Sequence, residues 1–191
     1  SSNPEADEEE RKYVFPDDDL YPHLVDAYFS HVNPFTPLLH RPTFEKQIAD
    51  GLHHQDSMFA KVFLLVCAHG SQHCDDPRVY AEGSTNTRSA GWKWFEQVNI
   101  MSEISTIEWF YMSSKCTQYV HYPHHSYPLN SSRTIQLYVL FACASEMPHG
   151  VWAQIGMALR LSQEVGGHRR RQTGVSGLPT AENELWKRAF W

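Results

Sequence analysis

The sequence has few cysteines and lacks the features that indicate export or membrane insertion. Its four cysteines form no Cys-x-x-Cys pair and follow no secretory leader; they are Cys67, Cys74, Cys116 and Cys143. We therefore expect reduced thiols in an intracellular protein. No apolar run approaches the roughly 20 residues that a membrane-spanning helix needs, so we expect no membrane contact.

Catalytic motifs are also absent. The sequence contains no nucleophile elbow, phosphate-binding glycine loop, dinucleotide fingerprint or His-Glu-x-x-His pair. Acidic residues are numerous, but no pair lies in a context that suggests acid–base chemistry. These absences predict that the chain is not an enzyme. The sequence accordingly assigns no catalytic residue and no metal ligand, and it leaves any cofactor-binding residue unknown.

Positive charge is in deficit, and the deficit is local. The formal net charge is −6, and residues 1–19 hold eight of the 22 acids but only two of the 16 bases. The rest of the chain is therefore neutral, which is a poor match for a polyanion. We expect that the chain does not bind DNA strongly by itself. Residues 1–16 are predicted to be a disordered acidic linker, with an acidic activation segment as the alternative.

What the sequence does contain favours a globular body over residues 17–191, because 41% of the chain is hydrophobic and 13% aromatic. A first helix is predicted from 20 to about 32, with residues 17–19 as its cap. Its apolar side chains recur at helical spacing: Leu20, Leu24, Val25, Tyr28, Phe29 and Val32. Three prolines then predict an extended loop, and three apolar side chains should anchor it in the core. The prolines are Pro34, Pro37 and Pro42, and the anchors are Phe35, Leu38 and Leu39.

Further helices are predicted downstream. Thr43 should cap one that runs through Ile48, and residues 58–68 should form a helix buried on all sides and ended by Gly70. Others are expected over 89 to about 99 and over 132–144. The second of these should be capped by Ser132 and should turn four side chains inward: Ile135, Tyr138, Val139 and Ala142. With two helices near the C-terminus, the predicted fold is all-α, an irregular bundle of about seven helices with Pro/Gly-rich loops.

The C-terminal block carries the most specific pattern. Its first part, from Trp152 to Arg169, has the spacing Trp-x-x-x-Gly-x-Ala-x-Arg-x-Ser-x-x-x-Gly-x-His-Arg. Its second part, residues 182–191, ends in Phe-Trp. The first part predicts an amphipathic helix closed by glycine. In the second part, Glu184 lies one helical turn before Arg188 and should pair with it. This block resembles the middle regulatory domain of fungal zinc-cluster (binuclear, six-cysteine) transcription factors, the fungal-specific domain of the xylanolytic-activator type.

A second, separate block is similar to the opening of the same domain. It shows Tyr28-Phe29, a proline-rich turn, and then Leu-Leu-His-Arg-Pro-Thr-Phe at residues 38–44. Residues 99–131 do not match the family pattern, and we interpret them as an insertion, with a gene-model error as one version of that hypothesis. The chain starts at Ser1 and stops inside a helical pattern at Trp191, so we expect both ends to be cuts through a longer protein.

The resemblance implies a regulatory module of a nuclear transcription factor that senses an effector or is auto-inhibitory. It implies that DNA is contacted by a zinc cluster outside this chain, because the six-cysteine spacing is absent here. No cofactor is therefore expected in this chain, and zinc is expected only in that cluster. Implied partners are DNA through the cluster, a small-molecule effector, and the transcription machinery or co-regulators. The resemblance also favours close helix packing at four residues: Trp152, Ile155, Gly156 and Leu159.

Two other classes of protein stay open. One is a helical protein-interaction scaffold. The other is a His-dependent metal enzyme, because His69 and His73 would share a helix face near Cys67 and Cys74. His121, His124 and His125 are interpreted as an incidental surface cluster, and the six tryptophans as core residues rather than the lining of a ligand pocket. Residues 169–171, three consecutive arginines, fit a phosphate contact, an import signal or helix C-terminal charge complementation.

Overall fold

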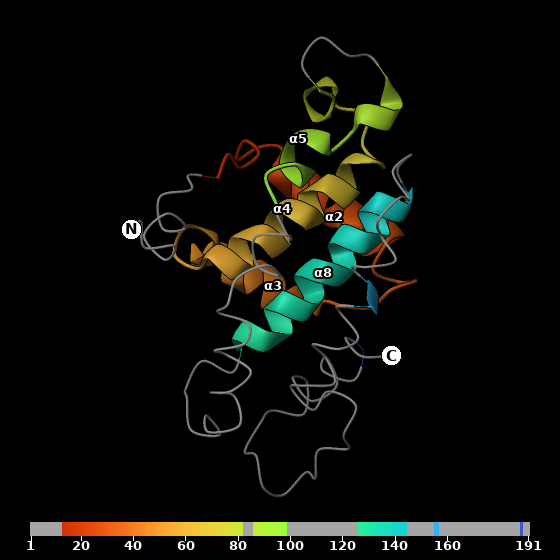
Figure 1. Ribbon diagram of the computed structural model, residues 1–191. Helices are drawn as coiled ribbons and strands as arrows, with labels where there is room; N and C mark the ends of the chain where they lie inside the picture. Colours follow the sequence, from red (N-terminus) through yellow and green to blue (C-terminus); the bar gives the residue numbers. More distant parts are fainter. Residues whose placement is uncertain (1–12, 82–85, 99–125, 145–154, 157–187, 189–191) are drawn as a thin grey trace, which may run out of the picture. The chain divides into compact units, whose positions relative to one another are not determined.

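The structure is a computed structural model that describes residues 13–81, 86–98, 126–144, 155–156 and 188. Within these ranges the regular structure is helical and contains no strand, which confirms the all-α class there. Figure 1 shows the five described α-helices: α2 (Tyr21–His31), α3 (Arg41–Ala49), α4 (Ser57–Ser71), α5 (Trp92–Phe95) and α8 (Ser126–Ala144). Three 3-10 helices accompany them: η1 (Leu52–His54), η2 (Pro77–Val79) and η3 (Thr87–Ser89). The expected count of about seven helices is not confirmed among these residues.

The chain divides into two compact units, which are described separately. The first contains residues 1–32 and 42–98, and the second contains residues 33–41 and 99–191. None of the described helices is long and apolar enough to cross a membrane.

Helix α4 is the core of the first unit. Every residue from Met58 to Ser71 is buried, as expected for a helix that is apolar on all sides. It starts at Asp56, whose carboxylate accepts hydrogen bonds from the backbone N–H groups of Met58 at 2.8 Å and Phe59 at 3.1 Å. This cap satisfies two donors that the first helical turn leaves unpaired. Helix α2 lies against α4 along the unit (Figure 1).

Two glycines allow other parts of the backbone to touch α4. A Cβ atom at Gly70 would lie 2.0 Å from the carbonyl oxygen of Leu24 in α2. A Cβ atom at Gly91 would lie 2.4 Å from the carbonyl oxygen of Ala68, and Gly91 also has a φ of 81°. Gly70 therefore does not end the helix, as the sequence predicted, but continues it to Ser71 at the point where α2 is closest.

Helix α2 has the predicted extent to within one residue and the predicted buried face, including Leu24 and Tyr28. Its predicted acidic cap is wrong. The N-cap position is Leu20, and no side chain caps the helix. Instead the backbone oxygen of Asp17 accepts from the N–H groups of Leu20 at 2.9 Å and Tyr21 at 3.0 Å. Pro22 lies in the first turn and has no N–H, which leaves one fewer donor for a cap to satisfy.

Helices α3 and α5 differ from their predicted bounds. Helix α3 begins at Arg41, before the predicted cap Thr43, and contains Pro42, which was expected in an extended loop. Proline is tolerated there because the first helical turn does not use its missing N–H. Helix α5 covers only the centre of the helix predicted from 89 to 99, because Gly91 adopts the left-handed conformation immediately before it.

In the second unit, the loop before α3 buries Leu38 and Leu39 as predicted. Phe35 was predicted to be a third anchor, and this is wrong, because its side chain is 86% exposed. Residues 32–35 form a turn, and the amide of Leu39 donates to Asn33 Oδ1 at 3.2 Å. The turn and the hydrogen bond to Asn33 direct the side chains of Leu38 and Leu39 into the core. They leave the side chain of Phe35 exposed to solvent on the outer side of the turn.

Helix α8, also in the second unit, begins at Ser126, upstream of the predicted cap Ser132. Ile135 and Ala142 are buried as predicted, whereas Tyr138 and Val139 are only half-buried. The most deeply buried apolar side chains are instead Leu137 and Phe141. The inward face is therefore rotated relative to the prediction.

Candidate functional site

Residues 13–19 of the first unit form no helix or strand and end in a turn, and we call this segment the N-terminal strap. The strap contacts residues that are far away in sequence, among them Gln97, Arg78 and His53. Its residues 13–16 are the end of the predicted linker, so ordered structure begins by residue 13. The strap and the surface beneath it are the candidate site.

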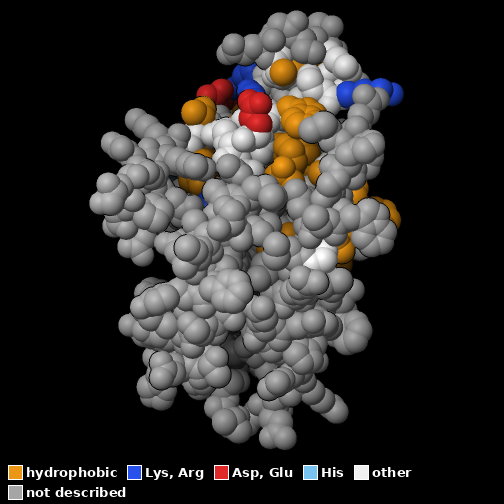
Figure 2. Space-filling model, viewed as in Figure 1, with side chains coloured by type: hydrophobic (Ala, Val, Ile, Leu, Met, Phe, Trp, Pro, Cys, Tyr) orange, Lys and Arg blue, Asp and Glu red, His pale blue; other side chains and the backbone are white. Residues whose placement is uncertain are grey.

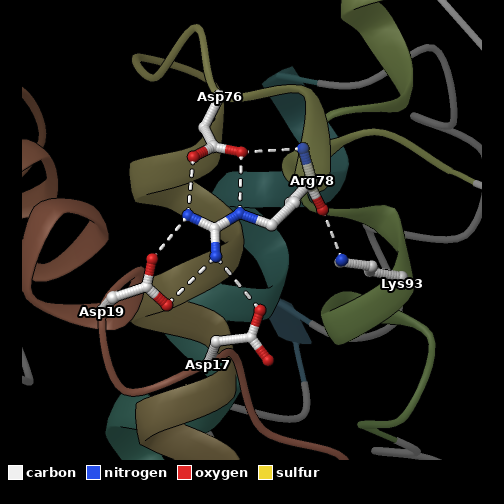
Figure 3. Close-up of polar contacts among 5 residues, drawn as sticks. All are labelled: Asp17, Asp19, Asp76, Arg78 and Lys93. Atoms are coloured by element: carbon white, nitrogen blue, oxygen red, sulfur yellow. Dashed lines mark hydrogen bonds and ion pairs between the residues drawn. The ribbon is translucent and has the colours of Figure 1, made fainter.

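Arg78 is the centre of the acidic end of the site (Figure 3). It lies in the middle of η2. Asp76 immediately precedes this helix and caps it by accepting a hydrogen bond from the N–H of Arg78 at 2.8 Å. The guanidinium donates to Asp76 at 3.1 and 2.9 Å and to Asp19 at 3.0 and 2.9 Å. It also donates to Asp17 at 3.2 Å. Lys93, from α5, donates to the backbone oxygen of Arg78.

These contacts determine what Arg78 can do chemically. A guanidinium has five N–H donors, and five hydrogen bonds to carboxylates use all of them. No donor remains for a phosphate or a substrate carboxylate while the strap is in place. In Figure 2 acidic side chains lie directly beside basic ones near the top of the view, so that part of the surface has mixed charge. The cluster is a clamp between the strap and η2.

The clamp shifts the protonation of its carboxylates. Hydrogen bonds from Arg78 lower the pKa of Asp76 from its usual 3.8 to about 2. The same guanidinium lowers the pKa of Asp19, mainly through its side-chain hydrogen bonds. The two carboxylates in turn raise the pKa of Arg78. All three groups therefore stay charged throughout the physiological range.

At the opposite end of the site, the side chain of Gln97 forms hydrogen bonds with the backbone of the strap. The N–H of Val14 donates to Gln97 Oε1 at 2.8 Å, and Gln97 Nε2 donates back to the carbonyl oxygen of Val14 at 3.1 Å. Gln97 Nε2 also donates to the carbonyl oxygen of Lys93 at 2.8 Å, which fixes the orientation of the amide. The side chain of Val14 is 69% exposed, so this pair recognises peptide groups and not the side chain.

Between these ends, Phe15 lies among three aromatic side chains. Its ring centroid is 5.1 Å from His53 and 5.2 Å from His54, both edge-to-face, and 5.7 Å from Phe63. Aromatic pairs favour this geometry at these separations. Burial lowers the pKa of His53, and positive charge on His54 lowers it further, while Asp18 opposes the shift. His53 is therefore neutral at pH 7 and packs edge-to-face with Phe15 of the strap.

Among the described residues, the two histidines of the suggested metal site, His69 and His73, lie in different surroundings. His69 is buried, with its ring 6.2 Å from Tyr28, whereas His73 is exposed and stacks on His31 at 4.8 Å. Desolvation, and then the charge of His31, lower the pKa of His73. Within the described residues no three His, Cys, Asp or Glu side chains are arranged to hold a metal ion.

The cysteines that the structure describes form no disulfide with one another; they are Cys67, Cys74 and Cys143. Cys67 is fully buried in α4, and its burial raises the pKa of the thiol well above the ordinary value. A thiol that stays protonated is a poor nucleophile. Helix α4 ends at Ser71, so His69 and His73 do not share one helix face as the sequence suggested.

Several other sequence predictions fall outside the described residues. They include the histidines at 121, 124 and 125, the arginines at 169–171, Cys116, Trp109, Trp152, Leu159, Glu184 and Trp191. Two tryptophans are described, and Trp94 is buried as predicted while Trp92 is half-buried. Ile155 is 37% exposed, and a Cβ at Gly156 would meet no atom within 4 Å in the described part of the chain. The close helix contact predicted for these two residues is not found there.

Sequence reasoning missed the residues that form the site, which are Gln97, Arg78, His53 and His54. One local signal was available: Asp75-Asp76-Pro77-Arg78 is an acidic cap followed by a proline and a base. It predicts that Arg78 folds back on Asp76. Nothing local pairs Arg78 with Asp17 and Asp19, which lie about 60 residues away.

Comparisons with known proteins agree on one relationship. The family model of the fungal specific transcription factor domain matches residues 25–191. Cutinase transcription factor 1 beta of Fusarium vanettenii is 25% identical over 174 residues, which cover 88% of this chain and 17% of that protein. Positive regulator of purine utilization of Emericella nidulans is 24% identical over 179 residues, covering 86% of this chain and 16% of that protein. No solved structure gives a significant match.

Proposed function

Because the chain belongs to the family of fungal specific transcription factor domains, we propose that it is the regulatory module of a transcription factor that contacts DNA elsewhere. The observation that carries this proposal is the family match over residues 25–191. The chain spans only 17% and 16% of the two curated relatives, so the greater part of such a protein lies outside it. We propose a zinc cluster in that other part as the DNA-reading element.

The distribution of charge supports DNA contact by another part of the protein and regulation by this chain. Outside residues 1–19 the acids and bases balance, and in the described part of the site Arg78 is occupied by carboxylates. Duplex DNA is held by several cations on one face, and a neutral body does not supply them. We propose that the module is not an enzyme, holds no cofactor of its own, and acts in the nucleus through the transcription machinery or co-regulators.

The all-α architecture suggests how a signal is transmitted. Helix α4 is touched by the backbone of α2 at Gly70 and by the turn before α5 at Gly91. Interfaces this close shift between discrete arrangements and do not deform gradually. An effector or an inhibitory contact that favours one arrangement would change the population of the active state.

We propose about seven helices for the whole module.

DNA binding gives the first test. Residues 1–191 and the full-length protein should be titrated against the same target duplex at physiological salt. We expect tight binding by the full-length protein and at least 100-fold weaker binding by residues 1–191, since only the non-specific term remains. Equal affinity of the two proteins would contradict the proposal.

Transcription gives the second test. Gly70→Ala in the full-length protein should change expression of a reporter gene while leaving its affinity for DNA unchanged. Gly156→Ala is the matched control, because a Cβ there meets no described atom and should leave the reporter unaffected. The proposal would be contradicted if neither variant changed reporter expression. It would also be contradicted if expression changed only in proportion to a change in affinity for DNA.

A further inference from the structure

We propose that the surface beneath the N-terminal strap is a docking site for an extended aromatic–proline–acidic peptide, with residues 13–19 of the same chain as its occupant. The inference concerns a peptide site within the first unit and stands independently of the transcriptional role. It rests on three groups of contacts that meet the strap in order along its length.

The first group recognises an extended backbone. Gln97 pairs with both the N–H and the carbonyl of Val14, as a neighbouring strand would. Peptide-binding domains obtain affinity from main-chain hydrogen bonds of this kind and specificity from neighbouring side-chain contacts. Because the Val14 side chain points to solvent, many residues would be accepted at this position.

The second group selects the side chain that follows. Phe15 has ring contacts with His53, His54 and Phe63, and Pro16 after it is buried. Phe15 is half-buried in this contact, and an aromatic anchor is the usual centre of binding energy in a peptide interface. Proline restricts the residue before it to extended conformations, which reduces the entropy lost on docking. This part of the surface therefore requires an aromatic side chain.

The third group selects negative charge. Arg78 receives Asp17 and Asp19 from the strap at 3.2 Å or less, in the arrangement shown in Figure 3. The strap carboxylates are 67% and 71% exposed, so water replaces their contacts easily when the strap leaves. A peptide without carboxylates at these positions would lose the contact.

The surface is held in place by contacts that do not involve the strap. Gln97 is oriented by the carbonyl of Lys93, and Arg78 by two hydrogen bonds to Asp76. The ring of His53 lies 4.9 Å from Phe63, which is a buried residue of α4. The three groups should therefore keep their positions when the strap is released, and a preformed surface is what a second peptide needs.

The strap itself is attached in a way that permits release. It contains no helix or strand, and its polar contacts with residues distant in sequence involve a side chain on at least one side. Its backbone contacts are those of the Asp17 oxygen with the N–H groups of Leu20 and Tyr21, at the adjacent start of α2. Release would leave the α2–α4 contact at Gly70 intact. Removal of the strap is therefore separable from unfolding.

The test uses residues 1–191 and a fluorescein-labelled peptide of residues 13–19. In the variant Val14→Pro/Phe15→Ser, the strap loses the N–H that Gln97 accepts and the aromatic anchor. We expect the peptide to bind this variant at least tenfold more tightly than the wild type, because the tethered strap competes at a high effective concentration. A peptide with Phe15→Ala should fail to bind. Absence of peptide binding to a variant with unchanged circular dichroism would overturn the proposal.

Two further arms keep the result specific. Adding Gln97→Ala to the released variant should abolish peptide binding, whereas adding Gln72→Ala, at an exposed glutamine after α4, should not. In the wild type, excess peptide should speed hydrogen exchange of residues 13–19 and leave exchange in α4 unchanged. Exchange that stays unaffected in the strap would contradict a releasable occupant. A wild-type dimer that Val14→Pro/Phe15→Ser dissociates would assign the strap to a second copy and overturn occupancy within one chain.

Discussion

Helix α4 and the N-terminal strap belong to the same unit but are held by opposite kinds of interaction. Helix α4 is buried along its length, and its closest contacts are backbone against backbone at Gly70 and Gly91. The strap is held by one aromatic anchor, one amide pair and exposed carboxylates. The contrast teaches that stability and adjustable binding are separated within the unit. Substitutions in the two regions should differ in both the size and the kind of their effect.

The largest effect is expected where α2 meets α4. Gly70→Ala places a methyl group 2.0 Å from the Leu24 carbonyl oxygen, so one of the two helices must move. We expect a loss of about 3 kcal/mol in the free energy of unfolding, measured by urea denaturation. Gly156→Ala, in an exposed helical position, should instead be neutral or stabilising by up to about 1 kcal/mol. Similar values for the two variants would disprove the close contact.

Gly91 combines a close contact with an unusual backbone conformation, and a matched glycine separates the two. Gly91→Ala adds a methyl group 2.4 Å from the Ala68 carbonyl oxygen at a φ of 81°. Gly51 has a φ of 71°, but its added Cβ would meet only Gln55, at 3.9 Å. Gly51→Ala should cost about 1 kcal/mol from strain alone. Gly91→Ala should cost at least about 2 kcal/mol in the same urea experiment, and equal costs would exclude the steric part.

The third effect concerns the two acidic segments that precede α2 and α4. Asp56→Ala should destabilise the chain by about 1 kcal/mol, because its carboxylate caps α4 through Met58 and Phe59. Asp17→Ala should have a much smaller effect on thermal unfolding, because only the backbone oxygen of Asp17 supports the start of α2. A larger effect at Asp17 than at Asp56 would restore the sequence-based capping model.

That pair of acids also shows what the sequence could and could not predict. The 3.6-residue periodicity of α2 and the continuous apolar run of α4 depend on local composition, and both helices were predicted close to their observed positions. Asp17 and Asp56 look alike locally, since each precedes a helix. Arg78, distant in sequence, draws the side chain of Asp17 away from the cap position.

The other mispredictions have the same origin. Glycine near a helix end usually terminates the helix, but Gly70 is required by the approach of Leu24 from another helix. Phe35 is apolar and lies next to buried leucines, yet a turn leaves it exposed. The strap surface combines Gln97, His53 and Arg78 from three separate segments of the chain, and these residues form no sequence motif. Local rules predicted the elements, and long-range packing determined the site.

Acidification should loosen the strap before it affects α4. Burial lowers the pKa of His53 more than Asp18 of the strap raises it, and the Phe15 ring packed 5.1 Å from His53 adds to that burial, so docking of the strap favours neutral His53. The stability that docking gains from neutral His53 is complete above pH 6.5 and decreases as the pH falls toward the lowered pKa. We expect faster hydrogen exchange of residues 13–19, relative to α4, at pH 5.5 than at pH 7.5. The relative change should disappear in His53→Asn and persist in His31→Asn, which alters the distant stacked pair.

The smallest effect is expected from the exposed clamp, where water screens the charges and little stability is gained. Asp76 has its pKa lowered to about 2, so its contribution is present above pH 3.8 and is lost only as the pH falls through about 2. Arg78→Gln removes the charged donor and should return this pKa toward 3.8, which an NMR titration of the Asp76 carboxyl carbon measures. Thermal unfolding at pH 7 should change little, whereas binding of the strap peptide to the released chain should fall. A large loss of stability with unchanged peptide binding would assign Arg78 to the core of the fold and separate it from the docking surface.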